Sequence, residues 1–152
     1  MRREAMEESH VDDIFTKGIH ALENDHIYLA LSCFEQAAYF ERTPLSCSYL
    51  AYCLAKVRSQ YPDAISLCKE SLEVEPGNPL HYLHLGRIYV MAGQRNKALS
   101  ILRQGLKCED NAALLSELTL LGERKQPVFP SLARSHPLNK IFGIVLNKLG
   151  IR

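Results

Sequence analysis

The sequence predicts an all-α fold: three helix hairpins stacked as a solenoid, then a seventh helix and a C-terminal amphipathic helix. Small residues recur every 34 positions along the chain, at Ala30, Ala64 and Ala98. Two expected helices open with a capping residue followed by proline, as Thr43-Pro44 and Asn78-Pro79. Proline suits the first helical turn because its missing N–H is not needed there. One hairpin cannot bury its apolar face alone, so about three units must stack.

Each expected helix is bounded by a cap, a turn residue or a break in the apolar pattern. Ser9 is expected to cap the first helix, and Pro62 to open the fourth in the same way as Pro44. Asn24-Asp25 and Gly93-Gln94 are typical of turns. The helices expected in this region span approximately residues 10–23, 27–41, 44–58, 62–74, 79–92, 95–108 and 111–124.

The small residues also predict close contact between the two helices of one hairpin. Gly18 and Gly86 each precede an alanine of the 34-residue series by twelve positions. We therefore expect the glycine of the first helix to face the alanine of the second. Large apolar residues four positions after the alanine, such as Phe34 and Leu102, fill the remaining space. Each is worth roughly 1.5–3 kcal/mol when fully buried.

Leu85-Gly86, Tyr89, Ala98 and Pro76, in their 34-residue period, resemble the tetratricopeptide repeat. The resemblance covers about residues 11–112, as repeats 11–44, 45–78 and 79–112, and implies a right-handed solenoid. It departs from the family where Tyr82 replaces the usual Trp and where Gly105 replaces the usual alanine of the second helix. The expected organisation is an N-terminal extension (1–9), a repeat domain (10–124, including the extra helix 111–124) and a C-terminal segment (125–152).

The resemblance implies that the first helix of each repeat lines a concave binding surface. The matching positions are Phe15, Ile19, Leu22, Tyr49, Tyr52, Lys56, Leu80, Leu83, His84 and Arg87. Such an apolar and aromatic lining with a few polar side chains suits an amphipathic helix, or an extended apolar segment that carries an acidic residue. Any one of these residues could instead pack between neighbouring repeats.

Some members of the family bind the terminal carboxylate of chaperone peptides through a clamp of Lys, Asn and Arg. The corresponding positions here hold Phe15, Ile19, Tyr49 and Leu80. The resemblance therefore disfavours a chaperone tail as the ligand and leaves another protein or peptide as the expected partner.

His81 and His84 lie three positions apart on an expected helix, a spacing that can supply two metal ligands. A closed site needs about four ligands, or three and a water, and no glutamate lies between the two as in H-E-x-x-H. G-x-S-x-G and glycine-rich phosphate loops are also missing. We expect no metal, no cofactor and no enzymatic activity; the weaker alternative is a metal-dependent enzyme at these two histidines.

After Gly122 the pattern changes to a segment with three prolines between Arg124 and Pro137, which predicts an extended connection. The helix expected after it has one apolar face: Leu138, Ile141, Phe142, Val145, Leu146 and Leu149. Six Lys and Arg follow Gly122 against the single acid Glu123. Three interpretations stay open: the helix docks on the solenoid as a cap or in its groove, binds another protein, or lies on an anionic membrane. Homodimerisation is a further possibility.

Composition narrows the class of function. The net charge is +1, so no overall field attracts nucleic acid. The opening residues hold no apolar run, and no segment approaches the roughly 18 apolar residues of a membrane span, so the cytoplasm is the expected location. Five cysteines without a C-x-x-C pair are expected to be small buried hydrophobes. The tail loosely resembles those of small bacterial repeat proteins, which favours a bacterial source. The expected role is an adaptor, scaffold or assembly factor.

Overall fold

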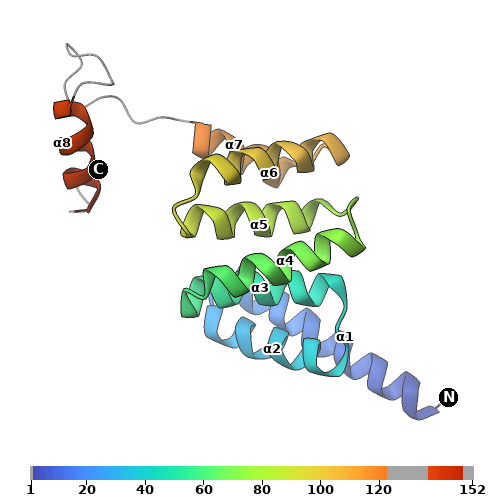
Figure 1. The fold of residues 1–152 in the computed structure, drawn as a ribbon. Coiled ribbons are helices and arrows are strands. Elements are labelled where there is room, and N and C mark those ends of the chain that lie inside the picture. Colours follow the sequence, from blue (N-terminus) through green and yellow to red (C-terminus); the bar gives the residue numbers. More distant parts are fainter. Residues whose placement is uncertain (1, 123–136, 149–152) are drawn as a thin grey trace. The chain divides into compact units, whose positions relative to one another are not determined.

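The computed structural model describes the chain over residues 2–122 and 137–148, and every element in these ranges is an α-helix. The chain forms two units, residues 1–121 and 122–152. Figure 1 shows the helices of the first unit stacked one after another. They are α1 (Arg2–Glu23), α2 (Ile27–Phe40), α3 (Pro44–Arg58), α4 (Tyr61–Val74), α5 (Pro79–Met91), α6 (Arg95–Cys108) and α7 (Ala112–Gly122).

The expected helices agree with the observed ones to within about three residues, apart from the start of the first. Helix α1 begins at Arg2, so Ser9 lies inside it and the prediction that Ser9 caps it is wrong. The residues from Arg2 to Glu8 are mostly Arg, Glu, Ala and Met, which are good helix formers, and no Gly or Pro interrupts them. Helix propensity therefore continues the helix past the serine.

The turn inside each helix pair repeats with the same period as the alanines. Asp25, Ser59 and Gly93 lie 34 positions apart, and each has a left-handed backbone with φ of 58°, 54° and 72°. Glycine adopts this conformation at no steric cost, and a short polar side chain such as aspartate tolerates it. The repeat is thus a repeat of backbone geometry, with different residues serving the same turn.

First and second helices of the pairs begin differently. The side chains of Thr43, Asn78 and Asn111 accept hydrogen bonds from backbone N–H groups in the first turns of α3, α5 and α7. These bonds satisfy donors that the helix itself leaves unpaired. Helices α2, α4 and α6 have no such side-chain bond. The predicted caps at Thr43 and Asn78 are confirmed, and Asn111 extends the series.

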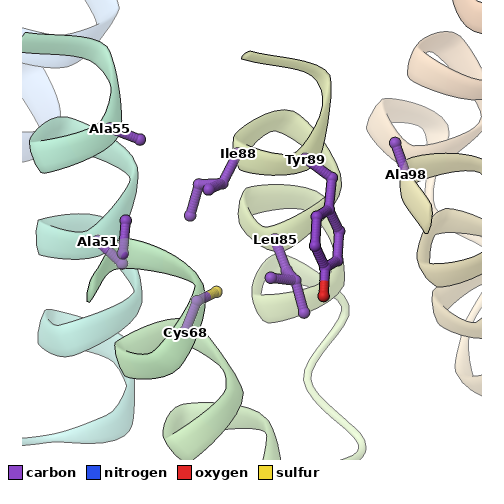
Figure 2. Packing of buried hydrophobic residues seen from close by; sticks show 8 residues of the cluster. Ala51, Ala55, Cys68, Leu85, Ile88, Tyr89 and Ala98 are labelled. Atoms are coloured by element: carbon purple, nitrogen blue, oxygen red, sulfur yellow. The ribbon is translucent and has the colours of Figure 1, made fainter. Parts of the chain in front are cut away.

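The central core lies where α5 packs against α3, α4 and α6. Figure 2 shows Leu85, Ile88 and Tyr89 of α5 close to small residues of the neighbouring helices. A Cβ on Gly86 would lie 2.4 Å from Leu102 Cδ2, so this position needs glycine. The nearest side chain to Gly86 is therefore Leu102, rather than the expected Ala98. Gly18 likewise lies closest to the Phe34 ring, because a glycine surface without Cβ receives the larger side chain.

Gly105, which departs from the family pattern, has a clear structural reason. A Cβ at this position would lie 2.6 Å from Tyr82 Cβ and 2.9 Å from Leu114 Cδ1. A Cβ atom cannot rotate away from its own backbone, so an alanine would push α6 and α5 apart. Tyr82 in turn donates a hydrogen bond from its hydroxyl to the Pro76 carbonyl, at 2.8 Å. The two departures, Tyr82 and Gly105, form one packing arrangement.

The cysteines do not all share one environment. Four are buried: Cys33, Cys47, Cys53 and Cys68. Burial raises the pKa of the Cys53 thiol to about 12 and that of Cys68 to about 11, so both stay protonated. The expectation of burial is wrong for Cys108, which is exposed because it is the last residue of α6.

The second unit contains α8 (Pro137–Lys148), whose first residue is a proline. Its exposed apolar side chains are Leu138, Ile141, Phe142, Ile144 and Val145. The side chain of Leu146 and the whole of Leu149 lie outside the described residues, as does the proline-containing connection before α8. Over residues 2–122 and 137–148, no helix is both long and apolar enough to cross a membrane.

Candidate functional site

The structure brings most of the predicted groove residues together on the first helices of the pairs. Aromatic rings from three helices form a connected set, which we call the aromatic row: Phe15 of α1, Tyr49 and Tyr52 of α3, and His84 of α5. Ile19 and Leu22 of α1 pack in the same hydrophobic cluster as the Phe15 and tyrosine rings. The row therefore runs across the stack, from one helix pair to the next.

The rings of the aromatic row meet in the orientations that aromatic pairs prefer. Phe15 and Tyr49 are edge-to-face with centroids 5.5 Å apart, and Tyr49 and His84 are edge-to-face at 4.4 Å. Tyr52 and His84 are stacked, 5.5 Å apart with 20° between their planes. Phe34 of α2 stacks on Tyr49 from behind, at 5.0 Å. Each ring is held by a neighbour, so the row is a rigid surface before any ligand arrives.

His84 supports the row from below instead of lining an open groove. Only 2% of its surface is exposed, and its Nδ1 lies 2.9 Å from the hydroxyl of buried Ser48. Burial, and after it the nearby charges of Arg87 and His81, lower the pKa of His84 to about 3. The imidazole is therefore neutral at physiological pH and positions the two tyrosine rings that cover it.

Two cations flank the Tyr52 ring. Lys56 Nζ lies 6.0 Å from the ring centroid and Arg87 Cζ lies 5.7 Å from it, distances at which cation–π attraction operates. Lys56 is also bonded to Asp25 Oδ1 at 3.2 Å, and Arg87 Nε to Glu117 Oε1 at 2.5 Å. Both cations therefore already have a carboxylate partner within the chain.

Sequence reasoning missed the two carboxylates. Asp25 was predicted only as a turn residue, and no local signal connects it with Lys56. Glu117 does carry a signal, because it is the single charged residue of α7. A lone carboxylate on an otherwise apolar helix indicates a specific partner.

Leu80 and Leu83 lie apart from the aromatic row. Both belong to the cluster that contains Tyr82, Leu102 and Leu114 and joins α5 and α6 to α7. Leu83 is buried and Leu80 is half-buried, because α7 packs against this part of α5. These two residues hold the repeats together and leave little surface for a ligand.

The histidine pair does not form one site. His81 is buried and its Nε2 lies 3.1 Å from Glu75 Oε2, whereas His84 is bonded to Ser48. Hydrogen bonds from Asn78 and then from His81 lower the pKa of Glu75. No cluster of three or more metal-ligating residues occurs in the described part of the chain. The two imidazoles therefore serve different contacts, His81 with Glu75 and His84 with Ser48.

Comparison with known proteins identifies the repeat. The model of a family described as tetratricopeptide repeat matches residues 58–119, from the end of α3 into α7. Residues 58–119 therefore form a tetratricopeptide repeat segment. The matched segment includes Pro76, Leu85-Gly86 and Ala98, on which the resemblance in the sequence depends. The first pair, α1 and α2, lies outside the match but has the same turn geometry as the other tetratricopeptide repeats.

Solved tetratricopeptide repeat domains have the same fold. The domain of Arabidopsis OM64 is 15% identical, with a TM-score of 0.63 over 78% of this chain and 99% of that one. The second such domain of human RPAP3, solved with the HSP70 peptide SGPTIEEVD, is 15% identical, with a TM-score of 0.61 over 78% and 99%. The Yersinia enterocolitica chaperone SycD, solved with a peptide of the translocator YopD, is 14% identical, with a TM-score of 0.58 over 75% and 93%. No curated protein sequence matches the chain.

Proposed function

We propose that this protein is an interaction module, an adaptor, scaffold or assembly factor, that binds a helical or extended apolar segment of another protein along the aromatic row. The observation that carries this proposal is the set of half-buried rings of Phe15, Tyr49 and Tyr52, the two tyrosines joined through buried His84, with Ile19 and Leu22 in the same cluster. The module needs no cofactor for this role and has no reaction of its own. Its proposed location is the cytoplasm.

The physical properties of the row suit this role. Tyrosine and phenylalanine offer large contact area with few rotatable bonds, so little conformational entropy is lost when a ligand covers them. Phe34 and His84 hold Tyr49 and Tyr52 from behind, which lowers that entropy cost further. An apolar side chain seated between the rings would displace water without leaving a polar group unpaired.

The structural neighbours support a protein or peptide partner in general terms. Human RPAP3 and Yersinia SycD were each solved with a peptide bound to a domain of this fold. Sequence identity near 15% indicates a common fold but does not indicate a common partner. The ligand of this chain therefore has to be inferred from the residues on its own surface.

Peptide selection followed by affinity measurement tests the proposal. Random peptides displayed on phage are selected on the full-length protein, and the winners are titrated against variants by fluorescence anisotropy. We expect apolar-rich peptides whose affinity falls at least about tenfold in Tyr52→Ala, a loss typical of an interface hot spot. The control is Tyr39→Ala, the same change at a tyrosine of α2 that is 85% exposed and outside the row. Equal losses in both variants, or no selected peptide, would contradict the proposal.

A second candidate function is peripheral attachment to a membrane through α8. The observation that favours it is the exposure of Ile141, Ile144 and Val145 on a helix that also carries Lys140 and Lys148. It predicts co-sedimentation with vesicles rich in anionic phosphatidylserine, weakened by salt and by replacing both lysines with glutamate. No sedimentation at low salt would exclude it.

Self-association through α8 is tested by the mass of the protein in solution. A monomer mass that does not change with concentration would exclude it.

A further inference from the structure

The two cations beside Tyr52, next to the aromatic row, could recognise an acidic ligand, but each already has a carboxylate partner within the chain. Lys56 is paired with Asp25, and Arg87 with Glu117. We infer that Asp25 and Glu117 are built-in counterions that determine ligand specificity: they make the row reject acidic peptides and accept uncharged apolar segments. This inference rests on the proposed function, because it concerns the ligand of the same surface.

The two pairs bracket Tyr52 from different parts of the fold. Asp25 comes from the turn between α1 and α2, and Glu117 comes from α7. Neither carboxylate lies on the helix of the cation that it neutralises. The partners of each pair are 31 and 30 positions apart in the chain, so both pairs exist only in the folded stack.

The Arg87–Glu117 pair opposes the binding of an acidic ligand more strongly than the Lys56–Asp25 pair does. Glu117 is only 21% exposed and Arg87 only 35%, so water screens this pair less than it screens an exposed one. A ligand carboxylate that took Arg87 would leave Glu117 half-buried without a partner, and such uncompensated charges are costly. Asp25 is 87% exposed, so its pairing with Lys56 is easier to exchange.

The other charges near the row also oppose an acidic ligand. Burial raises the pKa of the Tyr49 phenol, the charge of Glu23 raises it further, and the charge of Arg87 opposes these two effects. The carboxylates of Glu23, Asp25 and Glu117 thus stand against the cations of Lys56 and Arg87. Because carboxylates of the same chain neutralise both cations, the surface around the aromatic row favours ligands with apolar side chains that fit it. It repels a ligand with excess negative charge.

An acidic peptide of known sequence provides the probe. Fluorescein-labelled SGPTIEEVD, the peptide solved with the human RPAP3 domain, is titrated against the full-length protein at low salt. The test variant, Asp25→Asn with Glu117→Gln, removes both counterions while keeping the shape of the side chains. Asparagine also tolerates the left-handed backbone at position 25. The matched control is Glu35→Gln on α2 with Glu70→Gln on α4. It makes the same charge change and breaks the exposed pairs with Arg58 and Arg42.

We expect no saturable binding of this peptide to the natural protein, which gives only a lower limit for its Kd. The test variant should bind with a Kd at least about tenfold below that limit, and this binding should be lost at high salt. The control should behave as the natural protein does. Tight binding to the natural protein, no gain in the test variant, or an equal gain in the control would each overturn the inference. If the double variant does not fold, Asp25→Asn alone is used, and we expect a smaller gain at Lys56, since Asp25 is exposed.

The apolar peptides selected on the natural protein separate this inference from the proposed function. They should bind the natural protein and the test variant equally, because they do not use the cations. If the acidic peptide behaves as expected but no apolar peptide is selected, the proposed function fails and the counterion assignment stands. If the apolar peptides bind as expected and the acidic peptide binds the natural protein tightly, the counterion assignment fails alone.

Discussion

Helices α1 and α5 hold the same place in their repeats, yet they differ in burial. Helix α5 buries eight of its 13 residues. Among the residues of α1 whose burial is described, from His10 onward, only Gly18 and Ala21 are buried. The cause is position in the stack: α5 packs against α3 and α4 on one side and α6 and α7 on the other, whereas α1 is the end helix. Burial in a solenoid is decided by neighbours as much as by the residues themselves.

The histidines make this difference concrete. His81 and His84 are buried on α5, while the equivalent positions of α1, 68 residues earlier, hold Asp13 and Thr16, which are exposed. The same position of the repeat thus carries a solvated polar residue at the end of the stack and a buried imidazole in its centre. Predictions that alter matched residues on the two helices test how far this contrast extends.

The largest effect is expected from truncating a buried leucine of α5. Leu85→Ala removes a side chain that is 1% exposed and should lower the free energy of unfolding by about 2–5 kcal/mol. Leu22→Ala on α1, where the side chain is half-buried, should cost only about 1 kcal/mol. Urea unfolding followed by circular dichroism measures both. Equal losses would show that α1 is as well supported as α5.

Acid should destabilise the protein through α5. The pKa of His84 is about 3 in the folded chain, far below its usual 6.5. Between these two values the unfolded chain binds a proton at this histidine and the folded chain does not. The stability from neutral His84 is complete above pH 6.5 and is lost as the pH falls from there toward 3. The free energy of unfolding should fall with a slope approaching about 1.4 kcal/mol per pH unit.

Urea titrations between neutral pH and 4.5, the ordinary pKa of Glu75, measure this slope. The folded pKa of Glu75 is lowered, so its own contribution to stability is lost only below that pH. His84→Leu should abolish most of the slope. His20→Gln, at an exposed histidine of α1, is the control and should leave it unchanged. A slope that persists in His84→Leu would assign the acid sensitivity to another group.

The glycines of the two helices offer a closer comparison. A Cβ at position 86 would meet Leu102 at 2.4 and 2.7 Å, and one at position 18 would meet the Phe34 ring at 2.8 Å. Overpacking costs about 1–3 kcal/mol, against roughly 1 kcal/mol gained from the better helix propensity of alanine. Gly86→Ala should therefore lower the melting temperature, and Gly18→Ala should lower it less. Gly77→Ala, where no atom lies within 4 Å of the added Cβ, should have little effect.

The smallest expected effect concerns the helix starts. Asn78→Ala removes the side-chain oxygen that accepts the Leu80 N–H at 3.1 Å, and should cost about 1 kcal/mol. His26→Ala, at the start of α2 where no side-chain cap bond exists, should change stability by less than about 0.5 kcal/mol. Thermal unfolding of the two variants side by side measures the difference. An equal cost would mean that the second helices are also capped in solution.

Local chemistry in the sequence determined most of the fold. The caps at Thr43 and Asn78 and the turns at Asp25 and Gly93 depend on residues a few positions apart. The 34-residue period is visible directly in the sequence, so these features can all be predicted without the structure. The same reasoning failed for Ser9, because a cap is used only where helix propensity stops, and here it does not stop.

Only the tertiary structure decided which predicted groove residues are buried and which stay accessible. The sequence placed Leu83 and His84 correctly on the first helix of a repeat, but α7 and the tyrosines of α3 cover them. The pairing of Asp25 with Lys56 and of Glu117 with Arg87 also depends on the tertiary structure, since each pair joins residues about 30 positions apart in the chain. Periodicity shows which helix face a residue occupies, whereas burial and pairing depend on which other helix reaches that face.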